Sequence, residues 1–459
     1  MLWRKASGLC LAMGLSACAV YHPVGLGEGA SVLTVPEAAV LSVQAAKIDR
    51  PYLSPTSIDL NQPLDANAIA VIAVLENPDL KALRAHAGVA DAQAFAARLL
   101  PDPTFNLAVD NPNSAPGVVA NIVGQLVQDI NLLRTRRVLA AQNKALTSQV
   151  RLDLAWAEWQ TAGAARLQAV RVVALERVVR LNRESKIAAE HLLDTSLRAA
   201  LRGDMAADPV QANRLAALDA ADKLRTNEAA FEVARGELAR LLGFPPGTVL
   251  RLAEAVQSTV VLEQCTLFEM AQHNRTDLKA LTAGYAAQEA SVHKAVLDQF
   301  PTLTLGLTGT RDSSNNKFIG GAVNFTLPLW NRNRGGIAVA QATRAALKTD
   351  YDARLFQTRS DIATAVAGVG LAKAAVAELN TQLPALEHYA AGSAKAAARG
   401  DLPQVTATLA AQTARDRHAA LIAAQQAVAE QMIALELLSG APIATWTQAP
   451  VKQAVSMNQ

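Results

Sequence analysis

Two short segments of the chain alternate apolar and polar residues, and a very long helical pattern follows each of them. Residues 104–110 and 302–308 place an apolar side chain at every second position, which is typical of strands with one apolar and one polar face. A turn-rich loop and a second alternating segment come next in both cases. We therefore expect strand hairpins at about 104–131 and 302–329, with strands long enough to cross a bilayer in a tilted barrel.

Alanine-rich segments with few turn residues follow both hairpins. They predict four long helices, at about 134–202, 205–242, 335–398 and 403–438. A helix of about 65 residues is on the order of 100 Å long, which no single globular domain requires. A Gly-Asp pair separates the two helices of each set, and glycine can end a helix while aspartate can cap the next one. The segments 202–204 and 399–401 therefore predict the tips of two antiparallel helical hairpins.

These elements occur twice because the chain is a tandem repeat. The pentapeptide Asp-Leu-Lys-Ala-Leu at 79–83 returns at 277–281, an offset of 198, and Arg-Gly-Asp at 202–204 returns at 399–401, an offset of 197. Several ordered matches at a near-constant offset indicate two copies of one unit. The copies span 63–255 and 256–445, and each opens with an expected helix, at 65–99 and 262–298. Residues 446–459 are expected to form a C-terminal tail.

Composition narrows the possible functions. The chain is 51% hydrophobic but only 4% aromatic, and its alanine excess favours long, closely packed helices over a bulky core. The net charge of +3 comes from dispersed residues, so no nucleic-acid partner is expected. Outside the leader we find no run of 18 uncharged apolar residues, and we expect no transmembrane helix. A membrane crossing would then require a closed barrel, for which the four strands of one chain are too few.

The N-terminus has the features of an export signal. Residues 1–17 combine the basic pair Arg4 and Lys5 with a short apolar stretch, as in a signal peptide. The following Leu15-Ser16-Ala17-Cys18 resembles the bacterial lipobox, in which the cysteine receives a diacylglycerol. Simple cleavage after Ala17 is the alternative. Residues 18–62 contain several prolines and read as an extended, lipidated arm. Apart from this lipid on Cys18, no cofactor is expected.

With these features, the chain resembles the TolC-like outer-membrane efflux proteins over about residues 63–445. The lipobox, the duplicated helix openings, the Pro-Thr strand starts and the two Arg-Gly-Asp tips carry the resemblance. It implies a mainly α fold with a small transmembrane β part: a homotrimer whose 12-stranded β-barrel, four strands per chain, continues into a long α-helical barrel. It also implies a non-enzymatic duct in the outer membrane, with a periplasmic adaptor protein and an inner-membrane RND pump as partners.

The cargo of such a duct is less well defined by the sequence. Residues 328–338 and 77–80 look like segments of the cobalt–zinc–cadmium type, heavy-metal subfamily, although Trp330 replaces an expected phenylalanine. The equivalent segment of the first copy, 132–137, lacks the glycine pair of the second. Heavy-metal cations are the first expectation. Organic drugs or a secreted polypeptide are alternative cargoes, and a periplasmic helical scaffold lipoprotein is the alternative to a duct.

The predicted tips supply the candidate site residues. These are Arg202, Gly203, Asp204, Arg399, Gly400 and Asp401. In a trimer they would gather at the periplasmic mouth, where alternating Arg–Asp pairs could hold it shut or contact an adaptor. A plain helix cap is the alternative.

No catalytic or metal-binding constellation is visible in the sequence. The seven histidines are scattered, without metal-ligand spacing, so no metal site is expected. Nucleophile-elbow and phosphate-loop signatures are missing, which argues against an enzyme. We expect Cys265 to be a small buried hydrophobic residue.

Overall fold

The computed structural model describes residues 21–26, 34–111, 113, 117–254, 260 and 262–448. The chain divides into two compact units, residues 1–35 and 36–459. In the first unit, residues 21–26 are exposed and belong to no helix or strand. The expected signal peptide and the lipobox with Cys18 lie outside the described residues. All elements discussed below belong to the second unit.

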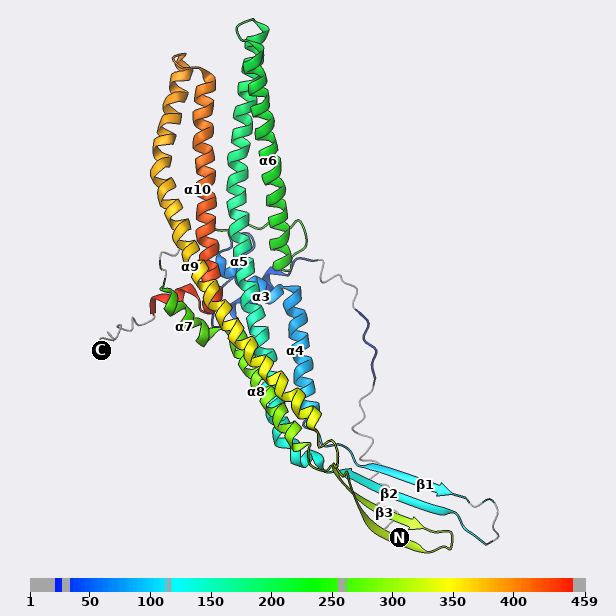
Figure 1. Cartoon of the computed structure of the whole chain (residues 1–459). Coiled ribbons are helices and arrows are strands. Elements are labelled where there is room, and N and C mark those ends of the chain that lie inside the picture. The colour runs from blue at the N-terminus through cyan, green and yellow to red at the C-terminus, as the bar shows by residue number, and fades with distance from the viewer. Residues whose placement is uncertain are drawn as a thin grey trace, which may run out of the picture. The chain divides into compact units, whose positions relative to one another are not determined.

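The second unit is mostly helical and carries one small sheet (Figure 1). The helices are α2 (Ala38–Ala46), α3 (Ala66–Glu76), α4 (Pro78–Ala96), α5 (Asn131–Leu201), α6 (Ala207–Leu241), α7 (Gln264–Asn274), α8 (Thr276–Leu297), α9 (Arg334–Arg399), α10 (Gln404–Ser439) and the 3₁₀ helix η2 (Ile443–Gln448). The strands are β1 (Thr104–Asp110), β2 (Asn121–Asp129), β3 (Leu303–Arg311) and β4 (Lys317–Phe325). The mainly helical fold with four strands was predicted from the sequence and is confirmed.

Two long helices, α5 and α9, run from the sheet to the far end of the helical body (Figure 1). Helix α5 packs against α3, α4, α6, α8 and α10, whereas α9 packs against α7, α8 and α10. Sixteen residues of α5 are buried and only seven of α9. Helix α9 therefore forms one lateral edge of the helical layer.

Two helices, α9 and α10, are long and apolar enough to cross a membrane by length and composition alone. This differs from the expectation of none, because windows that contain an occasional charge also qualify. The apolar character of both comes largely from alanine. They pack against each other along the hairpin, so composition is weak support for a membrane span here.

The first repeat opens with two helices, and the expected single helix at 65–99 is wrong. Pro78 is the first residue of α4, where its missing N–H and fixed φ are tolerated. The preceding Asn77 is extended, with φ −54° and ψ 123°, as a residue before proline prefers. Its side chain accepts a hydrogen bond from the Leu80 N–H at 3.0 Å and donates one to the Leu241 carbonyl at 2.9 Å. The break is thus fastened to the end of α6.

The second repeat breaks at the equivalent place without a proline. Arg275, 198 residues after Asn77, has φ −60° and ψ 120° and separates α7 from α8. Its guanidinium donates to both carboxylate oxygens of the buried Asp277, at 2.9 and 2.7 Å. It also lies 4.6 Å from the ring centroid of Trp156 on α5. The expected single helix at 262–298 is therefore also wrong. The break is held by a buried ion pair and has no proline or glycine that would mark it in the sequence.

A left-handed glycine ends each helical hairpin against these breaks. Gly243 has φ +68°, and a Cβ there would lie 2.4 Å from the Glu76 carbonyl oxygen. Gly440 has φ +67°, and a Cβ there would lie 2.9 Å from the Arg275 backbone nitrogen. Only glycine accommodates both the backbone conformation and the close approach.

Two apolar cores surround the breaks. The first joins α2, α3, α5 and α6, and the second joins α7, α9, α10 and η2. Residues 38–46 were expected within an extended arm but form a helix, and Leu41 and Ala45 of that helix are buried one turn apart. Trp446, the first residue of the expected tail, is only 1% exposed in the second core. Helix α2 and Trp446 therefore each complete one of the two cores.

The four strands form one antiparallel sheet in the order β1-β2-β3-β4. Strands β1 and β2 come from the first repeat, and β3 and β4 from the second. The central β2–β3 pairing, which aligns Leu126 with Leu307, joins the two repeats. The strands lie within the predicted hairpins at 104–131 and 302–329.

Candidate functional site

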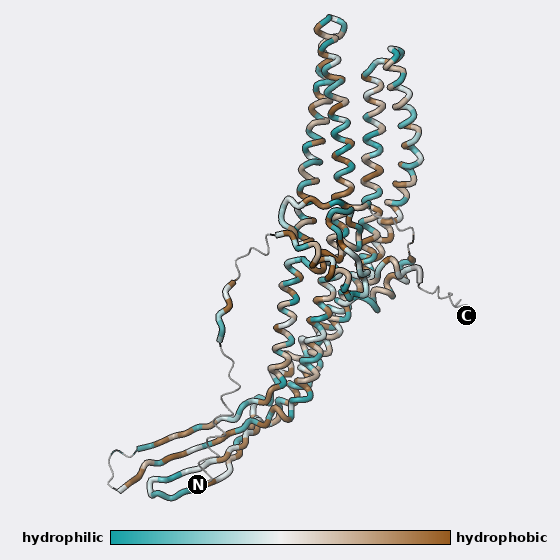
Figure 2. Tube along the Cα trace, turned by 180° about the vertical axis from the view of Figure 1, so that it is seen from behind, coloured by the Kyte–Doolittle hydropathy of each residue, from teal (hydrophilic) through white to brown (hydrophobic). Residues whose placement is uncertain are grey.

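The sheet has one apolar face. The register aligns Phe105 with Leu126, Leu126 with Leu307, and Leu305 with Val323, so these side chains share a face. The apolar residues of this face are Phe105, Leu107, Val109, Ile122, Leu126, Leu303, Leu305, Leu307, Ile319, Val323 and Phe325. Most are exposed, Leu307 at 57% for example. Figure 2 shows the resulting alternation of apolar and polar residues along the strands.

The opposite face is polar or small. It carries Thr104, Asn106, Asn121, Gln125, Thr304, Gly306, Thr308, Thr310, Ala322 and Asn324 at the alternate positions, with Val123, Val127 and Phe318 among the exceptions. A sheet whose apolar face is this extensive and uncovered needs an apolar surface to lie against, while its other face suits water. The sheet therefore has the geometry to separate an apolar environment from water.

Both edges of the sheet are open within one chain. Among the described residues, strand β1 pairs only with β2, and β4 pairs only with β3. The outward N–H and C=O groups of β1 and β4 are therefore free to pair with other strands, as edge strands generally are.

The predicted tip residues lie in two matching turns at the far end of the helical body from the sheet (Figure 1). Gly203 has φ +80° and Gly400 has φ +83°. The Asp204 N–H bonds to the Ala199 carbonyl at 2.9 Å, and the Asp401 N–H bonds to the Ala396 carbonyl at 3.0 Å. Together with the glycine N–H bonds, these contacts make each turn a Schellman motif.

The charged tip residues pair locally. Arg202 Nε donates to Asp204 Oδ2 at 2.9 Å, and Arg399 Nε donates to Asp401 Oδ2 at the same distance. All four side chains are 60–71% exposed, so each pair stabilises the turn by at most about 1 kcal/mol. Neither aspartate caps the next helix, because α6 and α10 have no side-chain N-cap bond. The aspartates therefore do not cap the following helices, whereas the glycines do end the preceding ones.

A buried charge cluster lies in the first core, and our sequence reasoning missed it. Glu158 on α5 has a side chain only 3% exposed. Arg50, which follows α2, donates to it at 2.6 and 3.1 Å, and Arg84 on α4 donates at 2.7 and 3.0 Å. Arg84 and Arg50 are separated from Glu158 by 74 and 108 positions in the sequence. The sequence feature that could have revealed this cluster is an acidic residue between Trp156 and Trp159, within an apolar stretch.

The arginines determine the ionisation of this cluster. Burial acts to raise the pKa of Glu158, but hydrogen bonds and charge from Arg50 and Arg84 outweigh it, and the pKa lies below its usual value. Burial, and then the Glu158 charge, raises the pKa of the neighbouring Tyr52 phenol. Glu158 is therefore a carboxylate in a confined site, and it holds the segment around Arg50 to the helical body.

A second buried pair connects the repeats. Arg166 Nη1 on α5 donates to both carboxylate oxygens of Glu436 on α10 at 3.0 Å. Nearby, Trp159 Nε1 donates to the Leu437 carbonyl at 3.2 Å. These contacts fix α5 against α10 across the boundary between the two repeats.

Two other candidate features are a metal site and the cysteine Cys265. Within the described residues, no group of three or more His, Cys, Asp or Glu side chains could hold a metal ion. Cys265 is exposed, so the expectation of burial is wrong. It lies on α7 away from the stripe of Leu267 and Ala271 that faces the second core.

Comparison with known proteins identifies a similar sequence family and similar folds. Residues 267–441 match the family described as outer membrane efflux protein. The fold is shared with solved outer-membrane efflux channels. The structure of CusC, from a study of transmembrane channel formation, superposes with a TM-score of 0.67 at 13% identity, covering 86% of this chain and 99% of that chain. The outer-membrane channel OprN gives 0.69 at 18% identity, covering 86% and 96%.

A third channel, CmeC of Campylobacter jejuni, gives a TM-score of 0.68 at 14% identity and covers 92% of this chain and 95% of that one. A search of curated protein sequences finds no match. The family match covers most of the second repeat, whereas the structural likeness extends over both. At these identities the likeness establishes the fold.

Proposed function

We propose that this protein is the outer-membrane channel of a tripartite efflux system, and that it forms a duct from the periplasm to the exterior. The four-stranded sheet, with one uncovered apolar face, one polar face and two open edges, carries the proposal. In lipid, an unpaired backbone group costs several kcal/mol, so such a sheet must close on itself. The apolar face then meets lipid and the polar face lines a water-filled lumen.

Closure with further copies of the chain satisfies these edges. If β4 of one copy pairs with β1 of the next, three copies make a barrel of twelve strands, within the known range. Such a head-to-tail contact closes into a ring. The helices support it, because large apolar residues remain exposed on α9 and also on α4 and α6. Examples are Val339, Phe356 and Leu371 on α9, and Val89, Leu215 and Val233 on the others.

The remaining parts of the proposal concern attachment and partners. A lipid on Cys18 would anchor the chain in the outer membrane beside the barrel. The helical body would extend into the periplasm, where its tips would meet an adaptor protein that connects to an inner-membrane RND pump. Arg202, Asp204, Arg399 and Asp401 are the candidate contacts, since they are the exposed charges of the two turns.

Heavy-metal cations are our proposed cargo, on the similarity of residues 328–338 to the heavy-metal subfamily. Organic compounds are the second candidate. A water-filled duct imposes little chemistry on what it carries, so selectivity would lie in the pump.

Extraction of a Cys18→Ala variant tests the duct against a lipid-tethered scaffold. An integral barrel should stay in the membrane fraction until detergent is added, and native mass spectrometry of the solubilised protein should give three chains per particle. Release of the variant by salt or alkaline buffer would contradict the proposal.

Deletion and complementation of the gene test the cargo. Growth limits would be compared across zinc, cobalt, cadmium, nickel, copper and silver ions and a panel of dyes and antibiotics. We expect selective sensitivity to metal ions in the deletion strain. Selective sensitivity to organic compounds would keep the duct and replace its cargo.

A further inference from the structure

Basic residues gather where the helices meet the sheet. Four segments lie at the junctions between helices and strands: 97–103, 129–137, 294–302 and 326–337. They contain the connecting residues and the adjoining ends of β2, α5, α8 and α9, and we call them the basal belt. The belt contains Arg98, Arg134, Arg136, Arg137, Lys294, Arg332 and Arg334, and the acids Asp102, Asp129 and Asp298. These seven basic and three acidic residues give the belt a net charge of +4, more than the +3 of the whole chain.

The belt arginines occur in both repeats and are poorly neutralised. Arg134 and Arg136 return as Arg332 and Arg334 at the offset of 198. Arg134 and Arg332 donate to the carbonyls of Pro301 and Pro328. Among the salt bridges between described residues, the only one in the belt joins Lys294 to Asp298, at 2.6 Å. Asp129 accepts hydrogen bonds from Asn131 instead.

Helix stability does not explain the belt arginines of α5 and α9. Arg134, Arg136, Arg137 and Arg334 lie in the first two turns of these helices, whose first turns contain no acidic residue. Arg98 and Lys294 differ, because they lie at the ends of α4 and α8, where the helix dipole favours a cation. Cations at a helix N-terminus oppose the helix dipole. Their placement in both repeats therefore points to a negatively charged partner outside the chain.

Apolar and aromatic side chains accompany the belt charges. Phe95, Leu100, Phe300 and Trp330 are exposed, Trp330 at 86%. Aromatic residues beside arginines are typical of the boundary between lipid and water. The belt thus places further apolar side chains next to the sheet, together with positive charge.

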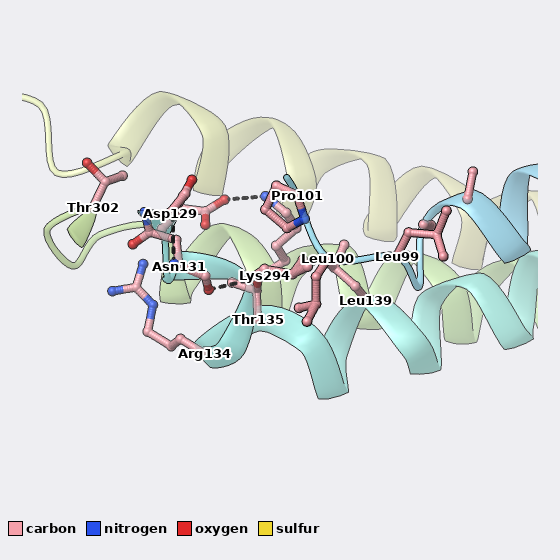
Figure 3. A pocket seen from close by; sticks show the side chains of 14 residues that line it. Leu99, Leu100, Pro101, Asp129, Asn131, Arg134, Thr135, Leu139, Lys294 and Thr302 are labelled. Carbon is pink, nitrogen blue, oxygen red and sulfur yellow. Dashed lines mark hydrogen bonds and ion pairs between the residues drawn. The ribbon is translucent and has the colours of Figure 1, made fainter. Parts of the chain in front are cut away.

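An open groove of about 650 Å³ lies in this belt (Figure 3). Leu99, Leu100, Pro101, Leu132 and Leu139 supply its apolar lining, and Arg134, Lys294, Asp129 and Asp298 lie among its polar residues. The buried Nε of Arg134 has no hydrogen-bond partner. The shape and lining suit a hydrocarbon chain that ends in a charged group.

We propose that the basal belt binds an anionic phospholipid of the periplasmic leaflet. The lipid phosphate pairs with the belt arginines, and one acyl chain lies along the leucines of the groove. The inference rests on the proposed function, since the belt lies at a membrane boundary only if the sheet spans the membrane. Each arginine near an anionic lipid surface strengthens binding by roughly fivefold.

Lipid titration of the detergent-solubilised protein tests this proposal. Phosphatidylglycerol and phosphatidylcholine with identical acyl chains would be added, and bound lipid counted by native mass spectrometry. We expect tighter binding of phosphatidylglycerol. The double variant Arg136→Gln with Arg334→Gln should weaken it roughly tenfold or more and leave phosphatidylcholine unchanged. The control, Arg198→Gln with Arg225→Gln on α5 and α6, should behave as the wild type.

Other results would overturn the proposal in distinguishable ways. Equal binding of the two lipids, or an equal loss in the control variant, would remove the belt as a lipid site. Binding of glycerol phosphate as tight as that of phosphatidylglycerol would assign the arginines to a soluble anion. In each of these cases the proposed channel function would still stand if the protein forms an oligomer that requires detergent. A wild-type protein that stays soluble without detergent would instead contradict the proposed function.

Discussion

In the first repeat, the helix break at Asn77 is made by a proline and an asparagine cap, whereas in the second Arg275 makes it with a buried Asp277. The equivalent Asp79 is exposed and contacts Arg240 at 3.4 Å. The surroundings differ as well, because α2 belongs to the first core and η2 with Trp446 belongs to the second. The same bend is therefore held by two different sets of contacts.

The ends of the two repeats show the opposite behaviour. Both tips have the same hydrogen bonds and a left-handed glycine, and both strand hairpins have the same division into an apolar and a polar face. The copies differ where single segments of the chain, with no duplicate, must be accommodated. They agree where, under the proposed function, both copies meet the same surroundings: lipid at the sheet and one kind of partner at the tips.

The largest expected effect tests the core of the first repeat. Removing the Glu158 charge leaves Arg50 and Arg84 without their carboxylate, and breaking a buried ion pair typically costs about 3–5 kcal/mol. Both arginines are partly exposed, so we expect about 3 kcal/mol for Glu158→Gln. Urea unfolding followed by tryptophan fluorescence measures it. Glu228→Gln, which removes an exposed pair with Arg183, is the control and should change stability by less than about 1 kcal/mol.

The same variant has a defined pH dependence. The pKa of Glu158 is lower in the folded protein than its usual value, so its contribution is complete above the unfolded pKa of about 4.3. It is lost as the pH falls further through the folded pKa. The stability difference between wild type and Glu158→Gln should therefore narrow below about pH 4. A difference that stays constant down to pH 3 would contradict the charge-based account.

The next effect tests whether the strands of the two repeats are equivalent. Leu307→Arg places a charge on the apolar face, which costs about 2–4 kcal/mol at the middle of a bilayer, whereas Thr308→Arg faces the polar side. We expect heat-stable oligomers in the outer-membrane fraction for the second variant and few for the first. Leu107→Arg and Ala108→Arg should repeat the contrast in the first repeat. Equal yields within each pair would contradict the assignment of the faces.

Substitution of the left-handed glycines compares the bases of the two hairpins. A Cβ at Gly243 would lie 2.4 Å from a backbone oxygen, one at Gly440 would lie 2.9 Å from a backbone nitrogen, and one at Gly203 would meet nothing within 4 Å. Gly203→Ala should cost only the left-handed conformation, about 1 kcal/mol. Gly440→Ala and then Gly243→Ala should cost progressively more, measured by thermal unfolding. Equal losses in all three would show that backbone conformation alone matters.

The sequence predicted the elements whose signals are local. Alternation over 302–308 and the Gly-Asp pairs at the tips lie within a few residues, so strands and hairpins could be located. The break at Arg275 has no proline or glycine, and one of the contacts that hold it, with Trp156, involves a residue more than one hundred positions away. The Arg50–Glu158–Arg84 cluster is equally non-local. Leu41 and Ala45 are a single apolar turn, too short to predict that α2 would be buried.

At the tips, local reasoning identified the residues but assigned the wrong contacts. A cap on the following helix was one of the two roles predicted for Asp204 and Asp401. An arginine two residues earlier reaches each carboxylate at 2.9 Å instead. A gate made of pairs between subunits would need these local pairs to exchange partners, which is feasible because both are exposed and individually weak.

The smallest expected change in stability therefore tests the role of the tips most directly. Asp401→Ala removes one exposed pair and should change the unfolding free energy by less than about 1 kcal/mol, with the oligomer intact. If Asp401 helps to close the mouth, the variant should admit an antibiotic that the wild type excludes, measured as a lower inhibitory concentration. Asp204→Ala should do the same if the two repeats act alike. Leak in only one variant would make the tips functionally unequal, and unchanged permeability in both would leave adaptor contact as their proposed role.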